Sequence, residues 1–411
     1  MKKILISAYG CSPVKGSEEH IGWSWAVNVA KKGYHVWCIT NFEDKEAILL
    51  EKNRLGLANL EFVFVELDRG LDKKLFDPSS KKVYIHYYLW RKKASSVAKE
   101  LHKKLSFDVV HHVSYGSLQQ GTYLWQLKNT KIIFGPVGGG QEALAEFKEY
   151  FGPAWKFEVI RTAISKYTLK YSSNLKNTIR YADHILVTND DTRRMVKETN
   201  IPLKNEPVLV LDSAIPDKML NFEYVARSSE GPLQLLWTGR LLPRKGLKLI
   251  FHSLSFLPKD LDYKLTIIGG GEQFHLLDEW IKEYGLDTAK LNIVGQIPYT
   301  EVSNYYKQAD VFLFCSLRDS HPTQLNEAMA FGIPIITLNI HGSAQVPDAC
   351  SIKINPTTKE ETARKISEAI IKFHKDTEYR KGCAVNAFNY AKTNTWAKKI
   401  DLVTDKFYEG N

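Results

Sequence analysis

The sequence predicts an α/β protein made of two Rossmann-like domains, each with a doubly wound parallel sheet. Short apolar runs alternate with amphipathic stretches along most of the 411 residues, as in sheets that are buried on both faces. The alternation stops across 200–232, which contains four prolines, and then restarts. A chain of this length holds two or three domains at about 100–200 residues per domain.

The first sheet begins with an apolar strand at 4–8 that ends in a loop containing Gly and Pro. A helix is predicted over 18–32, because Ile21, Trp25 and Val29 share one helical face. The remaining strands of this sheet are predicted at 36–40, 61–66, 108–113, 131–134 and 185–188.

The second sheet restarts the same alternation after the proline-rich stretch. We therefore predict one domain over 1–212 and another over 213–394, followed by an amphipathic helix around 396–408. Ligands of such sheets bind outside the carboxyl ends of the strands, so a cleft between the domains is expected. The strands are predicted at 234–238, 264–268, 291–294, 311–314 and 333–337.

Composition is typical of a globular protein, with 44% hydrophobic and 25% charged residues, and this excludes a disordered chain. The five cysteines are widely spaced and form no CxxC pair, which argues against zinc and disulfides and favours a reducing compartment. No apolar run reaches the roughly 18 residues of a membrane-spanning helix. We therefore expect a cytoplasmic protein that contacts a membrane only at its surface.

The net charge of +10 lies in the first half, where residues 1–210 hold 32 basic and 22 acidic residues. Residues 69–104 alone hold 11 basic and three acidic residues, with Tyr and Trp between the lysines. This pattern suits an anionic membrane surface, but it equally suits a core helix with a solvated basic face. No motif for nucleic-acid binding is present, so nucleic acid is not an expected partner.

Two glycine-containing loops of the first domain are candidates for ligand contact. Gly16 precedes the helix at 18–32, where free backbone N–H groups could bind a phosphate or a sugar hydroxyl. Gly138 and Gly139 lie in a run of three glycines after the strand at 131–134, which lets the backbone approach a ligand. Each loop could instead be an ordinary strand–helix connection.

The second domain carries the charged candidates. Arg240 and Lys245 follow the strand at 234–238, and two cations at such a junction can bind a diphosphate. Asp319 and Glu327 follow the strand at 311–314, where both carboxylates can face one cleft and accept hydrogen bonds from sugar hydroxyls. The alternatives are a solvated basic loop and acids that complement a helix N-terminus.

These residues resemble the retaining nucleotide-sugar glycosyltransferases of the GT-B fold, specifically glycosyltransferase family 4. The signature of that family is a Glu, seven residues, a second Glu and then Ala-Met-Ala-x-Gly-x-Pro. This chain has Asp319, Glu327 and Ala-Met-Ala-Phe-Gly-Ile-Pro at 328–334. The resemblance implies that 1–212 binds the acceptor, that 213–394 binds the donor, and that the helix at 395–411 packs back on the first domain.

The resemblance also implies a role for each candidate residue. Asp319 would contact the donor sugar, and Arg240 and Lys245 would stabilise the departing diphosphate. The donor would further contact Gly16, Gly138, Gly139, Gln296, Ile297, the backbone N–H groups of Thr323 and Gln324, and Glu327 at its ribose.

Two departures from the family pattern affect the catalytic candidates. Asp319 is one methylene shorter than the Glu of the family, which could either change the sugar hydroxyl that it reaches or indicate a different donor. Many members carry a His after the fifth strand, but this chain has Gly135-Pro136-Val137 there. His112, or its neighbour His111, could act from the preceding strand, although a His at a strand end is commonly structural.

The implied reaction transfers a sugar from a nucleotide-diphosphate sugar, with UDP or GDP expected, to an acceptor hydroxyl with retention of configuration. It serves cell-surface polysaccharide or glycolipid synthesis, without a cofactor or a protein nucleophile. No metal is expected, because Asp260-Leu261-Asp262 precedes its strand and lies at the wrong sheet edge. The alternatives are an epimerase or phosphorylase of the same fold, and a catalytically silent carbohydrate-binding subunit.

Overall fold

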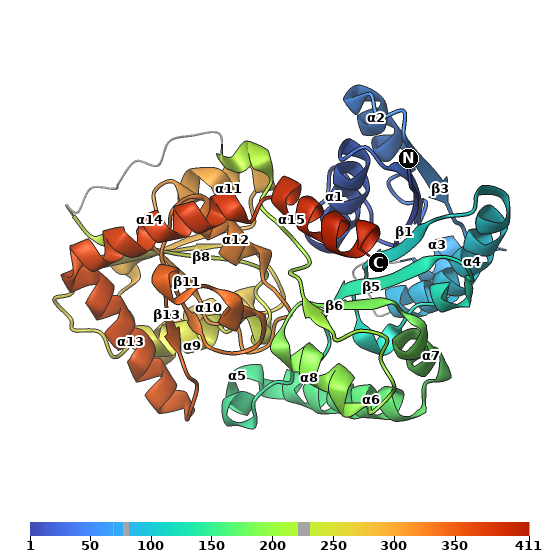
Figure 1. Ribbon diagram of the computed structural model, residues 1–411. Coiled ribbons are helices and arrows are strands. Elements are labelled where there is room, and N and C mark those ends of the chain that lie inside the picture. Colours follow the sequence, from blue (N-terminus) through green and yellow to red (C-terminus); the bar gives the residue numbers. More distant parts are fainter. Residues whose placement is uncertain (69, 77–81, 221–230, 411) are drawn as a thin grey trace. The chain divides into compact units, whose positions relative to one another are not determined.

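The computed structural model describes residues 1–68, 70–76, 82–220 and 231–410, and it divides into two compact units (Figure 1). The first unit contains residues 1–140, 164–213 and 396–411, and the second contains 141–163 and 214–395.

The first unit is built on a parallel sheet in the order β3-β2-β1-β4-β5-β6-β7. Its strands are β1 (Lys3–Ala8), β2 (His35–Thr40), β3 (Leu60–Phe64), β4 (Val109–Ser114), β5 (Lys131–Val137), β6 (His184–Val187) and β7 (Val208–Leu209). Its helices are α1 (Ser17–Lys31), α2 (Lys45–Leu55), α3 (Leu71–Leu75), α4 (Lys82–Leu105), α7 (Ser173–Tyr181), α8 (Asp190–Glu198) and α15 (Trp396–Val403).

The second unit is built on a parallel sheet in the order β10-β9-β8-β11-β12-β13. Its strands are β8 (Leu233–Thr238), β9 (Tyr263–Ile268), β10 (Leu291–Gly295), β11 (Val311–Phe314), β12 (Ile335–Leu338) and β13 (Ser351–Ile354). Its helices are α5 (Lys148–Phe151), α9 (Leu247–Leu254), α10 (Leu277–Glu283), α11 (Tyr299–Tyr306), α12 (Thr323–Ala330), α13 (Lys359–Lys375) and α14 (Thr377–Thr393), while α6 (Trp155–Tyr171) runs from one unit into the other.

Both faces of the second sheet are buried. Val311 and Leu313 of β11 pack into one core cluster with residues of α9 and α13. Phe312 and Phe314 point to the other face and pack with residues of α11, α12 and α14. Because successive side chains of a strand alternate between faces, a sheet covered on both sides needs continuous apolar strands. The predicted Rossmann-like class of both sheets is therefore confirmed, and every predicted strand is present with small shifts in its bounds.

The strand order places a topological switch point in each unit. In the first unit, successive strands are added on one side of β1 up to β3 and then, from β4 on, on its other side. In the second unit the same change of side occurs between β8 and β11. At such a point the loops after neighbouring strands diverge to opposite faces of the sheet and leave a crevice for a ligand. The loops after β8 and β11 carry the charged candidates of the sequence.

Residues 141–163 lie within the predicted first domain, 1–212, but cluster with the second unit. Phe147 and Phe151 are buried in the core of the second unit. The Tyr150 hydroxyl also lies 2.7 Å from Nδ1 of His252, on α9. Apolar burial and this hydrogen bond attach the segment to the second sheet.

The C-terminal residues 396–411 are counted with the first unit. Ile400 and Phe407 are buried, and the Tyr408 hydroxyl lies 2.8 Å from Nδ1 of His111 on β4. The other ring nitrogen of His111 lies 2.6 Å from the Gly135 carbonyl oxygen, so it is the donor to that carbonyl. Nδ1 therefore accepts from Tyr408, and the ring joins the C-terminus to β4 and β5.

The described part of the basic segment 69–104 forms α3 and most of α4, while residues 69 and 77–81 lie outside the described residues. Tyr87 and Trp90 of α4 are buried against the first sheet. The exposed large hydrophobic side chains of α4 are those of Tyr84, Ile85 and Tyr88. None of the helices in the described ranges combines the length and apolar character that crossing a membrane requires.

We predict that Tyr408→Phe destabilises the first unit. The substitution removes the hydroxyl and leaves the buried Nδ1 of His111 without its donor, which costs about 1–3 kcal/mol. Urea unfolding of the full chain measures this loss. Tyr84→Phe, at an exposed tyrosine of α4, is the matched control and should leave the unfolding free energy unchanged. Equal stability of both variants would contradict the role of His111.

Candidate functional site

The candidate site of the second unit begins where the loops after β8 and β11 touch. Gly246 has a φ of +71°, and a Cβ at this position would lie 2.0 Å from the Cys315 carbonyl oxygen. A side chain therefore cannot be accommodated there without moving the backbone. This close approach brings Lys245, the residue before Gly246, against the loop that carries Asp319.

Lys245 and Asp319 form an ion pair, and the lysine is 6% exposed. Arg244 contacts the same carboxylate oxygen at 3.2 Å, and the Ser316 hydroxyl donates to it at 3.3 Å. Burial by itself raises the pKa of Asp319, but Lys245 and Arg244 lower that pKa well below its usual range. Asp319 is therefore an ionised carboxylate and a weak base.

Arg240 differs from its two basic neighbours. It lies just after β8 and is exposed. Its guanidinium makes no ion pair or hydrogen bond within the described part of the chain, whereas Arg244 and Lys245 are engaged by Asp319. Arg240 therefore remains available to a ligand phosphate.

Glu327 lies on α12, and its carboxylate accepts hydrogen bonds from two tyrosines of α11. One carboxylate oxygen accepts from the Tyr299 hydroxyl at 2.8 Å, and the other accepts from the Tyr306 hydroxyl at 2.9 Å. Tyr306 is buried and also lies 3.0 Å from the Thr238 hydroxyl at the end of β8. Burial raises the pKa of Glu327, and the two tyrosines partly offset this effect. Tyr299 is 61% exposed, so a ligand hydroxyl can replace its hydrogen bond.

The remaining candidates of this unit lie at the same carboxyl edge of the sheet. Thr323 and Gln324 are the first residues of α12, and their backbone N–H groups have no acceptor within the helix. Gln296 is exposed and Ile297 half-buried in the loop after β10. That loop is tied to the one after β9, because the Gly269 N–H donates to the Gly295 carbonyl at 2.8 Å.

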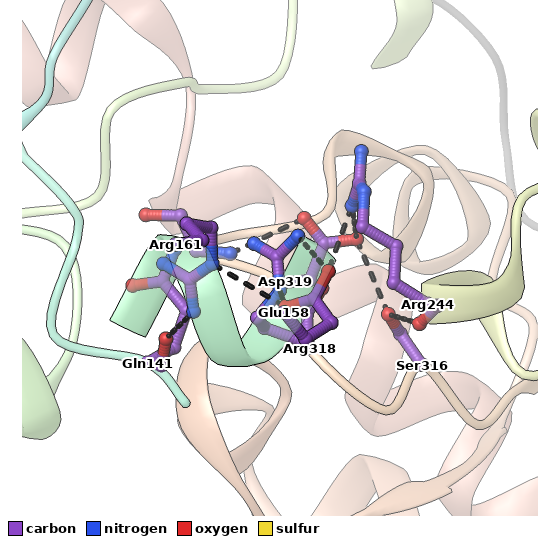
Figure 2. A network of polar contacts seen from close by, with 8 residues as sticks. Gln141, Glu158, Arg161, Arg244, Ser316, Arg318 and Asp319 are labelled. Carbon is purple, nitrogen blue, oxygen red and sulfur yellow. Dashed lines mark hydrogen bonds and ion pairs between the residues drawn. The ribbon is translucent and has the colours of Figure 1, made fainter. Parts of the chain in front are cut away.

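A polar network that sequence reasoning missed supports the Asp319 loop (Figure 2). Arg318 contacts both carboxylate oxygens of Glu158, a residue of α6, at 2.6 and 2.9 Å. Glu158 also accepts from Arg161 at 3.3 Å, and Arg161 donates to the Gln141 carbonyl at 2.8 Å. The sequence carries no signal for this contact, because Glu158 and Arg318 are far apart along the chain.

The candidates of the first unit lie at the carboxyl edge of its own sheet. Gly16 is the N-cap of α1 and has an extended backbone, and a Cβ at this position would have no atom within 4 Å. Gly139 has a φ of +124°, and a Cβ there would lie 2.2 Å from the side-chain oxygen of Gln119. Gly138 forms a bridge with Ser117. Gly139 is thus required by its backbone conformation and by a contact within the chain, whatever the glycine run contributes to a ligand.

The two histidines of β4 have different environments. Both ring nitrogens of His111 are hydrogen-bonded, one to the Gly135 carbonyl and the other to the Tyr408 hydroxyl, so we assign His111 a structural role. His112 is 3% exposed, and no partner for its Nε2 lies among the described residues. Burial, reinforced by Arg91, lowers the pKa of His112 to about 4. The ring is therefore neutral at physiological pH.

Part of the chain is similar to known glycosyltransferases. Residues 223–390 match the family described as glycosyl transferases group 1. The chain is 23% identical over 231 residues to the phosphatidylinositol N-acetylglucosaminyltransferase GPI3 subunit of Saccharomyces cerevisiae. It is 26% identical over 225 residues to the putative colanic acid biosynthesis glycosyltransferase WcaL of Salmonella typhimurium. The matches cover 51% and 53% of this chain and 50% and 54% of these relatives, so the chain spans about half the length of the curated relatives it matches.

Solved structures resemble the whole chain. Sucrose-phosphate synthase from Thermosynechococcus elongatus has a TM-score of 0.67 and 16% identity, and the match covers 100% of this chain and 99% of that protein. HepE from Anabaena, solved in complex with UDP-glucose, has a TM-score of 0.62 and 13% identity, with 100% of both chains covered. At such identities the likeness shows the fold, which is the predicted GT-B fold.

We predict that Glu158→Gln destabilises the second unit by about 1–3 kcal/mol, because Arg318 loses a charged partner in a poorly hydrated position. Urea unfolding measures the effect. The matched control is Glu51→Gln, which breaks the exposed Glu51–Arg54 pair of α2 and should cost less than about 1 kcal/mol. If the two substitutions cost the same, the Glu158 network does not support the Asp319 loop.

Proposed function

We propose that the protein is a retaining glycosyltransferase of family 4, which moves a sugar from a nucleotide-diphosphate sugar to an acceptor hydroxyl. One observation carries the proposal. The paired charges Lys245 and Asp319 lie with Glu327 at the switch point of a unit that itself matches a glycosyltransferase family. These are the residue types that a diphosphate, a sugar and a ribose require at one sheet edge.

The donor is proposed to lie along this edge with its phosphates at the cations. Arg240 and Lys245 bind the diphosphate together with the backbone N–H groups at the start of α12. Glu327 accepts from the ribose hydroxyls, and one of them replaces the hydroxyl of the exposed Tyr299. Tyr306 keeps the carboxylate in place from its buried side.

The base and the sugar occupy the two ends of the proposed donor site. The backbone of Gln296 and Ile297 faces the base, and Asp319 faces the transferred sugar. A UDP-sugar is the first donor to test, because the structurally similar HepE was solved with UDP-glucose. From the first unit, Gly16, Gly138 and Gly139 are proposed to contribute backbone contacts to the donor.

Charge stabilisation is proposed to carry most of the catalysis. Departure of the nucleoside diphosphate develops negative charge, which fixed cations and N–H groups stabilise better than water does. Asp319 is a poor nucleophile, because two cations hold its carboxylate. His112 of the first unit is kept as a proposed catalytic residue, and it would act as a neutral, buried ring. A same-face substitution, with a donor phosphate taking the acceptor proton, needs no protein nucleophile.

The acceptor is proposed to be a carbohydrate or a lipid-linked saccharide of cell-surface polysaccharide or glycolipid synthesis. The yeast relative is named as a phosphatidylinositol N-acetylglucosaminyltransferase subunit, and the Salmonella relative as a putative glycosyltransferase of colanic acid biosynthesis. All five cysteines are buried and free, which supports a reducing compartment such as the cytoplasm.

The proposal is tested first by donor binding and then by turnover. Saturating UDP, GDP and ADP-sugars are compared for their effect on thermal unfolding, since a ligand at 100 times its Kd adds about 2.7 kcal/mol of stability. The stabilising donor is then incubated with saccharide acceptors, and release of nucleoside diphosphate is followed. We expect release that depends on the acceptor, a product with the donor's anomeric configuration and the same rate in EDTA.

Other results would identify other functions. Transfer of a glycosyl group to inorganic phosphate, with formation of a sugar 1-phosphate, indicates a phosphorylase. Conversion of the donor into an isomeric nucleotide sugar without release of nucleoside diphosphate indicates an epimerase. Donor binding without turnover indicates a carbohydrate-binding subunit. An inverted product contradicts the retaining assignment, and loss of the rate in EDTA contradicts metal independence.

We predict that Lys245→Ala lowers kcat by about 100-fold or more, because one fixed charge that stabilises the leaving diphosphate is lost. Steady-state kinetics with the identified donor measure the effect. Lys282→Ala, at an exposed lysine of α10 in the same unit, is the control and should keep the wild-type rate. Thermal unfolding confirms that both variants are folded. A wild-type kcat in the Lys245 variant would refute the diphosphate assignment.

A further inference from the structure

Helix α6 carries an exposed apolar stripe that neither the fold nor the proposed site uses. Ile164, Tyr167 and Tyr171 are 59%, 67% and 57% exposed, and they lie in the part of α6 that is counted with the first unit. Spacings of three and four residues place them on one helical face.

Such a stripe is unusual on a protein surface. Exposed apolar side chains normally occur singly, whereas contiguous ones mark an interaction site. The opposite face of α6 already has its partner, because Ser165 is buried and accepts from Gln119 at 2.7 Å. The stripe is therefore not required for packing α6 onto the first unit.

The charges on the exposed side of α6 are all positive. Lys156, Lys166 and Lys170 are exposed on the flank of the stripe. The one acid of this helix, Glu158, is half-buried and contacts Arg318. Lys170 lies 5.3 Å from the ring centroid of Tyr171, so cation and aromatic ring are presented together.

We propose that α6 binds the surface of an anionic membrane, lying in the plane of the interface. The apolar stripe enters the boundary between headgroups and acyl chains, and the lysines contact the anionic headgroups. The tyrosines suit this depth because their rings are apolar and their hydroxyls remain hydrated. The rings of Tyr167 and Tyr171 lie 4.8 Å apart and form a continuous surface.

Charge favours a membrane over a second copy of the chain as the occupant of this face. In a symmetric dimer the same patch faces itself, which would bring the lysines of both copies together. An anionic bilayer instead supplies opposite charge to every lysine. Helix α4, where the sequence left membrane contact and a core helix as equal alternatives, is a weaker candidate because its aromatic residues Tyr87 and Trp90 are buried.

The proposal is tested by co-sedimentation of the full chain with vesicles, a readout that does not depend on sugar transfer. Vesicles of phosphatidylcholine with phosphatidylglycerol are compared with vesicles of phosphatidylcholine alone. The stripe variant is Ile164→Asp with Tyr167→Asp, and the charge variant is Lys166→Gln with Lys170→Gln. Leu402→Asp is the matched control, because Leu402 on α15 is also 59% exposed.

We expect the wild-type chain and the Leu402 variant to bind the anionic vesicles and the stripe variant to remain in solution. The charge variant should bind about tenfold or more weakly, and added salt should weaken wild-type binding. Thermal unfolding confirms that each variant is folded. The proposal is overturned if the wild-type chain does not bind anionic vesicles, or if the stripe and Leu402 variants lose binding equally. Concentration-dependent dimers that only the stripe variant abolishes, without vesicle binding, would assign the face to a second copy instead.

Discussion

The buried ion pair between Lys245 and Asp319 is the constraint on which the candidate site depends. Removing two charges from water is costly, and the cost is recovered only when both partners meet with good geometry. That geometry requires the loops after β8 and β11 to touch, which Gly246 permits by its positive φ and its missing side chain. The pair in turn keeps the Asp319 carboxylate ionised. Of the three cations at the loop after β8, only Arg240 is exposed, whereas Arg244 and Lys245 contact Asp319.

The same site shows where charged residues can lie in a unit whose strands are apolar. The strands of the second sheet are buried on both faces, so the polar groups concentrate in the loops at its carboxyl edge. Glu327 illustrates the transition, because it lies on α12 between buried neighbours while the buried Tyr306 donates to one of its oxygens. The other oxygen accepts from the hydroxyl of the exposed Tyr299.

The segment 141–163 links two features that are unrelated in the sequence. Its aromatic residues Phe147 and Phe151 join the core of the second unit, and this attachment places Glu158 beside Arg318 (Figure 2). The same helix, α6, continues into the first unit and exposes Ile164 and Tyr167 to solvent. One helix therefore supports the loop of Asp319 with one face and offers an apolar stripe with another.

The sequence by itself determined the class of both sheets, the order of their strands along the chain and the loops that carry charge. Periodicity and glycine positions are local signals, and the motif from Asp319 to Pro334 lies within one short stretch. Strands β7 and β13 escaped prediction, since the first has two residues and the second alternates polar and apolar side chains. The tertiary structure alone decided that Asp319 pairs with Lys245, that Glu158 reaches Arg318, and that Trp90 is buried while Tyr167 is exposed. Those facts depend on which distant residues fold against each other, and neither periodicity nor composition records such contacts.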